Sequence, residues 1–489
     1  SGAIGGAISL RTADPDAGNG IRLSTTIGPW GERILAGRVA AGNRRIRGVL
    51  AAEAFAREGD FPYTDQASFP STTRLRENAD GSAQNVFGKL VVVGDRSTLE
   101  VAAWAARADR GLPGLAGAGL RVERQKDDLG RLWVRLSRNR TTFSASSHWS
   151  RLTYVNPAQG IDDTGRATTA SIAASRNQPI GVGIETDVGV ELSVASADHP
   201  ALQSDPGRYG LRTFLLGRLD RGAMRVHPAV RVDGFVRKGQ WVGQISPGLR
   251  IRLNRPLGIP VAVKAGLSTG FRAPTLNDLF WRGQGAVGNE DLQPERSISY
   301  DLGGEIQGSS FSVDLSAYYQ RVRNEISWVA GENGVWSPEN IGRVHTIGIE
   351  AATRKSMTFS RSITTDVEVR YTYTDSRDRS DPGSSRFGKP VRHVPAHLVN
   401  TGISSTWRFL KMGLSVRWTD RRYVTVDASE WLQAYLVADA HVSAAVDTRY
   451  GRFDLAVFVE NLGGREYQIM SGYPMPPRHA RLQLTATFK

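Results

Sequence analysis

Two histidines and three aspartates are the residues whose types and spacing could bind a metal ion. His393 and His397 are four residues apart, which on a β-strand separates them by about 13 Å, too far for one ion. Asp375, Asp378 and Asp381 offer oxygen ligands of the kind that calcium takes. Arginines lie between them, however, and no glycine turn sets their spacing. We therefore expect ordinary strand and loop roles, and no metal site.

Other chemistry is not indicated by any motif. The chain lacks a Ser-His-Asp order, a glycine-rich phosphate loop and a paired-carboxylate motif, and acidic pairs such as Glu290-Asp291 are typical of turns. It has 0 cysteines, so disulfides and thiolate metal sites are excluded. We expect no catalytic residues, no cofactor and no enzymatic activity.

The net charge of +14 suggests two kinds of partner. A nucleic-acid-binding protein would show basic blocks with interleaved aromatic residues, whereas the arginines here are scattered along the whole chain. A barrel with arginines in its lumen and on its rims is compatible with that distribution, and it would meet anionic lipid head groups. We expect no nucleic acid.

The elements that position these residues are alternating strands. From Asp366 to Tyr373 one face carries Val and Tyr while the other carries Asp, Glu, Arg and Thr, and residues 482–488 repeat the design. No segment predicts a convincing helix. At Gly270–Phe280 the pattern indicates a strand that breaks at Pro274 and enters a long polar loop.

The connections between these strands alternate between tight turns, such as 93–96, and long loops, such as 58–82 and 150–167. Short turns on one rim and long loops on the other are typical of an outer-membrane barrel. The segments predict about 22 antiparallel strands, an even number that leaves both termini of the chain on the short-turn rim. A barrel of this size encloses a lumen too wide for side chains to fill, and a plug normally occupies it.

Several motifs resemble those of TonB-dependent outer-membrane receptors. A G-F-R-A-P-T segment begins at Gly270 and leads to an N-x-x-L-x-P-E turn at Asn289, and a strand ending G-I-E lies at 348–350. An N-L pair near residue 461 and a terminal aromatic residue complete the set, spread over essentially the whole chain. The residues that carry the resemblance are Gly270, Phe271, Arg272, Ala273, Pro274, Asn289, Leu292, Pro294, Glu295, Asn340, Gly348, Glu350, Asn461, Leu462 and Phe488.

The resemblance implies a domain arrangement. Residues 1–13 are similar to the last strand of a plug domain, 14–20 would be a linker and 21–489 the transmembrane barrel. The plug body and the energy-coupling box that precedes it in the family are missing from the sequence. We therefore expect the plug to be disordered or removed, supplied by another chain, or lost together with transport.

The resemblance also implies a function. A cobalamin- or siderophore-receptor-like barrel would take up a scarce large solute through the outer membrane of a Gram-negative-type cell. Its partners would be outer-membrane lipid and lipopolysaccharide, a TonB-type energy-coupling protein if a plug is present, and a separate plug chain or envelope-complex subunits. The alternatives are a passive pore, a structural subunit of an envelope complex, or a soluble all-β binding module.

Ligand contacts are expected from the long-loop rim, because aromatic residues and arginines often anchor ligands. Loop packing is an equally good explanation for each candidate. Tryptophans near strand ends are also expected to form membrane-interface girdles. The ligand candidates are Arg272, Asn277, Trp281, Trp336 and Tyr473, and the girdle candidates are Trp104, Trp241, Trp328, Trp407 and Trp418.

Overall fold

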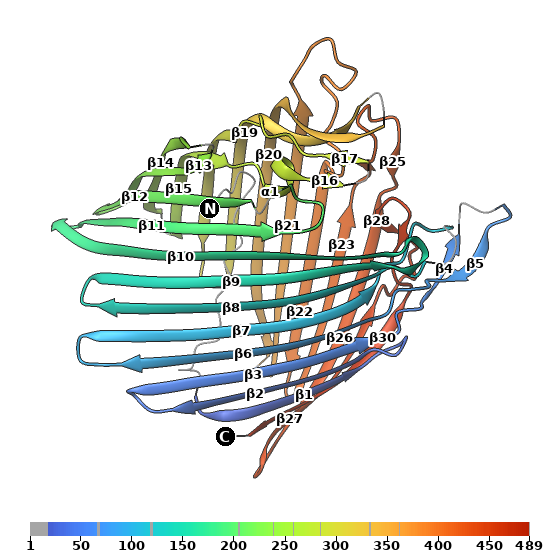
Figure 1. The fold of residues 1–489 in the computed structure, drawn as a ribbon. Coiled ribbons are helices and arrows are strands. Elements are labelled where there is room, and N and C mark those ends of the chain that lie inside the picture. The colour runs from blue at the N-terminus through green and yellow to red at the C-terminus, as the bar shows by residue number, and fades with distance from the viewer. Residues whose placement is uncertain are drawn as a thin grey trace.

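The computed structural model shows a closed antiparallel β-barrel of 22 strands (Figure 1). It describes residues 18–65, 69–117, 121–203, 206–237, 239–257, 259–283, 285–331, 334–360 and 362–488. The segment expected to be a plug strand, 1–13, lies outside these residues, as do residues 14–17 of the expected linker.

The barrel strands follow one another in chain order, each paired with its neighbours. They are β1 (Gly20–Ile27), β2 (Arg33–Gly42), β3 (Ile46–Arg57), β6 (Gly81–Val93), β7 (Ser97–Gly111), β8 (Arg124–Arg138), β9 (Thr141–Asn156), β10 (Ile161–Gly181), β11 (Ile184–Asp198), β12 (Gly207–Arg221), β13 (Met224–Arg237), β14 (Gln240–Leu257), β15 (Ile259–Arg272), β18 (Glu295–Gln307), β19 (Phe311–Ala330), β20 (Trp336–Ser360), β21 (Ile363–Asp378), β22 (His397–Trp407), β23 (Leu410–Thr419), β26 (Tyr435–Thr448), β27 (Gly451–Glu460) and β30 (His479–Phe488).

Short elements lie in the long loops. The β4–β5 hairpin, blue in Figure 1, extends beyond the rim of the barrel. These elements are β4 (Pro62–Asp65), β5 (Thr72–Leu75), the 3-10 helix η2 (Pro157–Gln159), α1 (Leu276–Phe280), β16 (Arg282–Gly283), β17 (Ala286–Val287), β24 (Arg422–Tyr423), β25 (Trp431–Leu432), β28 (Gln468–Met470) and β29 (Tyr473–Pro474).

The two faces of the wall differ as the alternation predicted. Leu302 and Leu315 are 61% and 53% exposed on the outer surface. On the lumen side of the same strands, Glu305 and Asp314 form ion pairs with Lys264 of β15. An apolar outer face and a charged inner face are the reverse of a soluble protein, so the alternative of a soluble module is wrong.

Closure depends on the first and last strands. β1 pairs with β30 in an antiparallel ladder that runs from Ile21 opposite Phe488 to Ile27 opposite Leu482. Both strands also pair with their other neighbours, β2 and β27, so neither presents a free edge. A closed barrel satisfies its backbone hydrogen bonds internally, which a bilayer requires.

The connections alternate in length as expected, with one correction. The sequence placed a long loop at 150–167, but β9 continues to Asn156 and β10 begins at Ile161. A continuous ladder from Arg176 opposite Thr141 to Ile161 opposite Asn156 joins the two strands. The polar residues of this stretch were interpreted as a loop, whereas strand pairing continues through them to the tip of the hairpin.

The tryptophan girdle is only partly present. Trp241 and Trp407 are 49% and 42% exposed on the outer face. Trp104 alternates with outward-facing residues and so faces the lumen, where it lies under the Arg131 guanidinium, and Trp328 bonds to Asp278. The girdle interpretation is therefore wrong for Trp104 and Trp328. Among the described residues, none of the helices has the length and apolar character needed to cross a bilayer.

Candidate ligand site at the long-loop rim

The segment 273–294 is not an irregular loop, because it contains the helix α1. Thr275 caps this helix by accepting a hydrogen bond from the Asp278 amide, and the Asp278 carboxylate accepts one from the Thr275 amide at 2.8 Å. This reciprocal capping box satisfies two amides that a helix start leaves unpaired. The expectation of a polar loop without helix is thus corrected over Leu276–Phe280.

Buried contacts fix α1 to the barrel. Arg208 of β12 donates to the Pro274 carbonyl, and the Trp328 indole donates to the Asp278 carboxylate at 3.1 Å. Leu279 is only 2% exposed. Figure 1 shows α1 close to the rim end of the barrel, near β16 and β20. The segment is therefore anchored by β12 and β19, two strands that are distant from each other in sequence.

Arg272 and Glu295 join the two ends of this segment. They are direct partners across β15 and β18, and their ion pair measures 2.7 Å. Glu295 is 4% exposed and also accepts a hydrogen bond from the Ile326 amide at 2.9 Å. A buried carboxylate needs such partners, so the pair primarily holds the strands together.

The turn that follows α1 is fixed by amide side chains. Asn289 donates to the Pro338 carbonyl and accepts from the Asp291 amide. Asn340 both accepts from the Gln293 amide and donates to the Gln293 carbonyl. Leu292, 1% exposed, lies between these two contacts in the chain. The motif residues of this turn therefore position the backbone.

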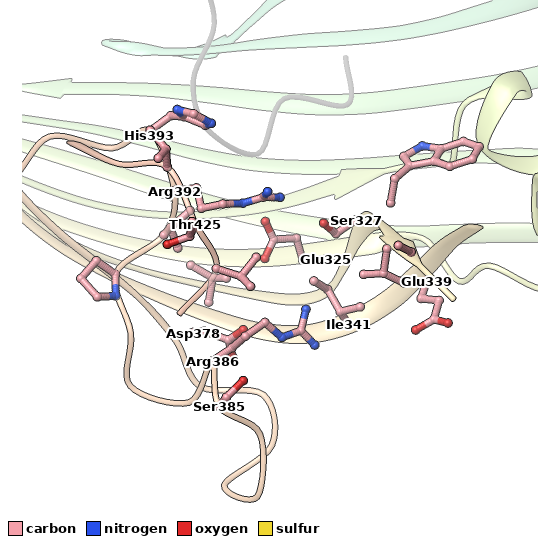
Figure 2. Close-up of a pocket in the computed structure, with 18 of the residues that line it drawn as sticks. Glu325, Ser327, Glu339, Ile341, Asp378, Ser385, Arg386, Arg392, His393 and Thr425 are labelled. Carbon is pink, nitrogen blue, oxygen red and sulfur yellow. The ribbon is translucent and has the colours of Figure 1, made fainter. Parts of the chain in front are cut away.

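A cavity of about 860 Å³ opens beside this anchored segment. Its walls are the rim ends of β19 and β20 and the loops 379–396 and 420–434. Figure 2 shows the loop with Ser385 and Arg386 facing the strand that carries Glu325 and Ser327. Binding sites for small molecules in proteins have comparable volumes.

The cavity lining is chemically mixed. Glu325, Glu339 and Asp378 supply carboxylates, while Arg386 and Arg392 supply guanidinium groups. The remaining lining side chains include valines, an isoleucine and two tryptophans. The field at Glu325 comes from Glu295 and Asp378 of like charge and from Arg272 and Arg386 of opposite charge. Such a lining can hold a solute that has both polar and apolar groups.

The predicted ligand residues are distributed unequally around this cavity. Trp336 is 47% exposed and lines it. The Trp281 ring packs against His199 in a tilted arrangement with 5.0 Å between the ring centroids, and Asn277 is an exposed residue of α1. Arg272 is engaged with Glu295. The Trp336 amide donates to Gly285, so these four residues belong to one side of the rim.

Tyr473 lies in a different part of the rim. The Arg76 guanidinium covers its ring at 5.5 Å, and burial lowers the pKa of Arg76. A second cavity of about 310 Å³ adjoins this loop and is lined by Tyr435 and Tyr467, whose rings are 4.5 Å apart. Burial and the neighbouring Tyr435 raise the pKa of Tyr467. The five predicted ligand residues therefore do not form one site.

The other motif residues have structural environments. Phe271 is 5% exposed and packs on Phe235, and the Gly270 carbonyl accepts from Gln244. Asn461, 3% exposed, bonds to Arg465 through both atoms of its side-chain amide. Ala273 is half-buried, Pro294 is buried and Glu350 is exposed. Gly348 lies beneath the Tyr318 ring, and the Leu462 amide donates to the Ala438 carbonyl. Phe488 packs edge-on against Phe453.

Sequence reasoning missed Glu325 and Arg386 as members of the cavity. Neither lies in a motif, and the loop of Arg386 approaches β19 only through the fold. The capping box of α1 could have been found, because Thr275 and Asp278 have the spacing of an N-terminal helix signal.

Comparison with known proteins decides the family. The model of the TonB dependent receptor-like β-barrel matches residues 58–462, most of the chain. The chain belongs to the TonB-dependent receptor family. It is therefore an outer-membrane β-barrel of a family of transport receptors.

Curated relatives of this receptor barrel include a vitamin B12 transporter and an iron-regulated outer membrane protein. A vitamin B12 transporter of Vibrio vulnificus is 26% identical over 376 residues, which cover 72% of this chain and 56% of the relative. An iron-regulated outer membrane virulence protein of Vibrio cholerae is 34% identical over 163 residues, or 29% of this chain and 24% of the relative. The chain spans 56% or less of the length of the curated relatives it matches.

Solved receptor structures share the fold. The FrpB iron transporter of Neisseria meningitidis superimposes with a TM-score of 0.78 at 12% identity, covering 98% of this chain and 83% of that one. The siderophore receptor PiuA of Acinetobacter baumannii gives 0.75 at 13% identity, covering 96% and 82%. At these identities the likeness concerns the barrel architecture only.

Proposed function

We propose that this barrel takes up a scarce large solute, such as an iron–siderophore complex or a cobalamin-like compound, and is not an enzyme. The observation that carries the proposal is the rim cavity of about 860 Å³ with its mixed lining, on a barrel of the TonB-dependent receptor family. Relatives named as B12 and iron transporters support this solute class.

In this mechanism the protein does no bond chemistry. The solute binds at the outer rim, where Arg386 and Arg392 contact its anionic groups and Trp336 covers apolar surface. Arg272, Asn277, Trp281 and Tyr473 remain candidate contacts. A TonB-type protein of the inner membrane then supplies the energy that clears the lumen, which in barrels of this size is normally plugged.

The decisive experiment measures uptake by cells that make the complete native gene product. Radiolabelled ferric siderophores and cobalamin are offered to cells with and without their TonB-type protein. Uptake of one solute class that disappears with TonB supports the proposal. Uptake that continues without TonB, together with a steady ionic conductance in planar bilayers, would favour a passive pore.

Binding variants test the cavity itself. Arg386→Ala and Arg392→Ala should weaken solute binding by about tenfold each, because charge-assisted contacts contribute about 1.5–3 kcal/mol. Arg449→Gln, in the short turn between β26 and β27, is the matched control on the opposite rim. Equal binding by all three variants would contradict a role for this cavity.

A further inference from the structure

The cavity at the long-loop rim has charges of opposite sign on its two sides. Its strand side is formed by residues 324–330 of β19 and 336–342 of β20, which contain Glu325 and Glu339 and no lysine or arginine. Its loop side, residues 379–396, contains four lysines and arginines against one aspartate. In a protein with a net charge of +14, a side whose charged groups are all carboxylates is a local exception. We call the two sides the acidic wall and the basic wall.

The strand pairing brings the two carboxylates of the acidic wall together. Ser327 is the direct partner of Glu339, and Glu325 lies two residues before Ser327 on the same strand. Direct partners share a face of a sheet, and so do residues two apart on one strand. All three residues line the cavity, and Figure 2 shows Glu325 and Ser327 next to each other within it.

Neither carboxylate of the acidic wall has a cation of its own. Within the ranges that the structure describes, Glu325 and Glu339 form no ion pair and accept no hydrogen bond through their side chains. Arg272, which is close to Glu325, is already paired with Glu295 at 2.7 Å. Arg386 attracts Glu325 from across the cavity without contacting it. A half-buried carboxylate such as Glu325 gains from a cationic partner, and a bound solute can supply one.

The basic wall is held in place by hydrogen bonds to neighbouring elements. The Arg377 guanidinium donates to the Gly388 carbonyl at 3.0 Å. The His393 amide donates to the Tyr423 carbonyl of β24 at 2.8 Å. These contacts fix the loop at two points, so the two walls stay on opposite sides of a space of about 860 Å³.

The acidic wall suits an ammonium group better than a metal ion. Over the described part of the chain, no three histidine, aspartate or glutamate side chains are arranged to hold a metal ion. Asp378, the third carboxylate of the lining, accepts a hydrogen bond from the Ser380 amide at 2.8 Å. Trp336, 47% exposed, lines the same cavity, and an indole is the strongest aromatic partner of an organic cation.

We propose that the solute bound in this cavity carries a cationic amino group, held by the acidic wall, in addition to anionic groups held by the basic wall. This inference rests on the proposed uptake function and adds the dipolar character of the solute. An ammonium group donates charge-assisted hydrogen bonds to Glu325 and Glu339, while Arg386 and Arg392 hold a carboxylate in bidentate geometry. A solute with charge of one sign only would leave one wall unpaired in a space largely closed to water, which weakens binding.

The test compares four ferric chelates of one trihydroxamate peptide. Its amino terminus is free or acetylated, and its carboxyl terminus is free or amidated. The iron centre is thus constant while each terminal charge is removed separately. Isothermal titration calorimetry measures the affinity of each chelate for the complete native protein in a neutral detergent. Acetylation and amidation should each weaken binding by about tenfold.

Each effect should disappear in the variant that lacks the matching wall. In Glu325→Gln/Glu339→Gln, acetylation should change the affinity by less than about twofold, whereas amidation should still weaken binding about tenfold. Arg386→Ala/Arg392→Ala should show the reverse. Glu339→Gln alone, at an exposed position, should lose part of the acetylation effect. Thermal unfolding of each variant verifies that the barrel is intact.

The matched control is Glu77→Gln, an exposed carboxylate outside this cavity, which should bind all four chelates like the unaltered protein. Equal binding of the free and acetylated chelates by the unaltered protein would overturn this inference and leave the uptake function standing. An acetylation effect that persists in Glu325→Gln/Glu339→Gln would also overturn it, because another group would then hold the amine. Absence of binding by all four chelates would overturn it together with siderophore uptake as the function.

Discussion

The side-chain amide of Asn340 forms two hydrogen bonds with the backbone of Gln293, at 2.7 and 2.8 Å. It thereby pairs with the turn as a neighbouring strand would. The same amide also donates to the Asn324 carbonyl at 2.9 Å. One side chain thus connects the turn after α1, the irregularity in β19 and the rim end of β20.

Replacing this amide should release the turn. In Asn340→Ala the Gln293 backbone loses both partners, so the amides of 288–293 should exchange with deuterium about tenfold faster, as expected for about 1–2 kcal/mol of lost hydrogen bonding. Hydrogen exchange followed by mass spectrometry measures this rate. Asn277→Ala, on the exposed surface of α1, is the control and should leave the exchange of that segment unchanged.

Gly348 leaves room for an aromatic ring. Tyr318 is its direct partner across β19 and β20, and a methyl group at residue 348 would overlap the Tyr318 ring. Gly348→Ala should therefore lower the unfolding free energy by about 1–3 kcal/mol, the usual cost of overpacking. Urea unfolding measures it. Gly402→Ala, where a methyl group meets no atom within 4 Å, should be close to neutral; equal losses in both variants would contradict the explanation.

The Arg272–Glu295 pair should show strong coupling. Glu295→Ala leaves the Ile326 amide without its acceptor, and Arg272→Ala leaves a buried carboxylate without its cation. A double-mutant cycle should give a coupling energy of about 1–3 kcal/mol. Arg354→Ala with Asp366→Ala, a lumen pair at 3.8 Å with both side chains largely exposed, should give less than about 1 kcal/mol. Similar values in the two cycles would show that burial does not matter here.

Ionisation of the Asp80 carboxyl should make the thermal stability of the protein depend on pH. Its hydrogen bonds to Arg124 hold the pKa of this loop carboxyl below its usual value of 3.8. Because the folded-state pKa is depressed, the stabilisation is present above the unfolded-state pKa and is lost as pH falls through the folded-state pKa. The thermal midpoint of Asp80→Asn should lie below that of the unaltered protein near pH 6, and the difference should shrink as the pH falls below 3.8 and vanish below the folded-state pKa. A constant difference across this range would contradict the assignment.

Much of the barrel could be predicted from the sequence because its signal is local. In Asp366–Tyr373 the alternation alone assigns each side chain to lumen or lipid, and short turns separate the strands. The length of the β9–β10 hairpin could not be predicted, because pairing beyond the apolar belt depends on the ladder and not on hydrophobicity.

The candidate ligand site could be predicted less completely from the sequence than the barrel. The family motifs identified Arg272, Asn289 and Glu295, but the structure shows these residues fastening the segment to the barrel. The cavity beside them is formed with Glu325 and Arg386, which come together only when loop 379–396 folds towards β19. Contacts of that kind depend on the tertiary structure, and no local spacing records them.

Because Ile21 pairs with Phe488, the barrel can close only after all its strands have been synthesised. A ribosome completes β30 last, so the hydrogen bonds that close the wall join the two ends of a very long loop and form late. Until then β1 and β30 each display unsatisfied amides and carbonyls, a template for pairing with other chains. Cells that make this protein must therefore keep β1 from pairing with other chains until β30, a strand of 10 residues, has been synthesised.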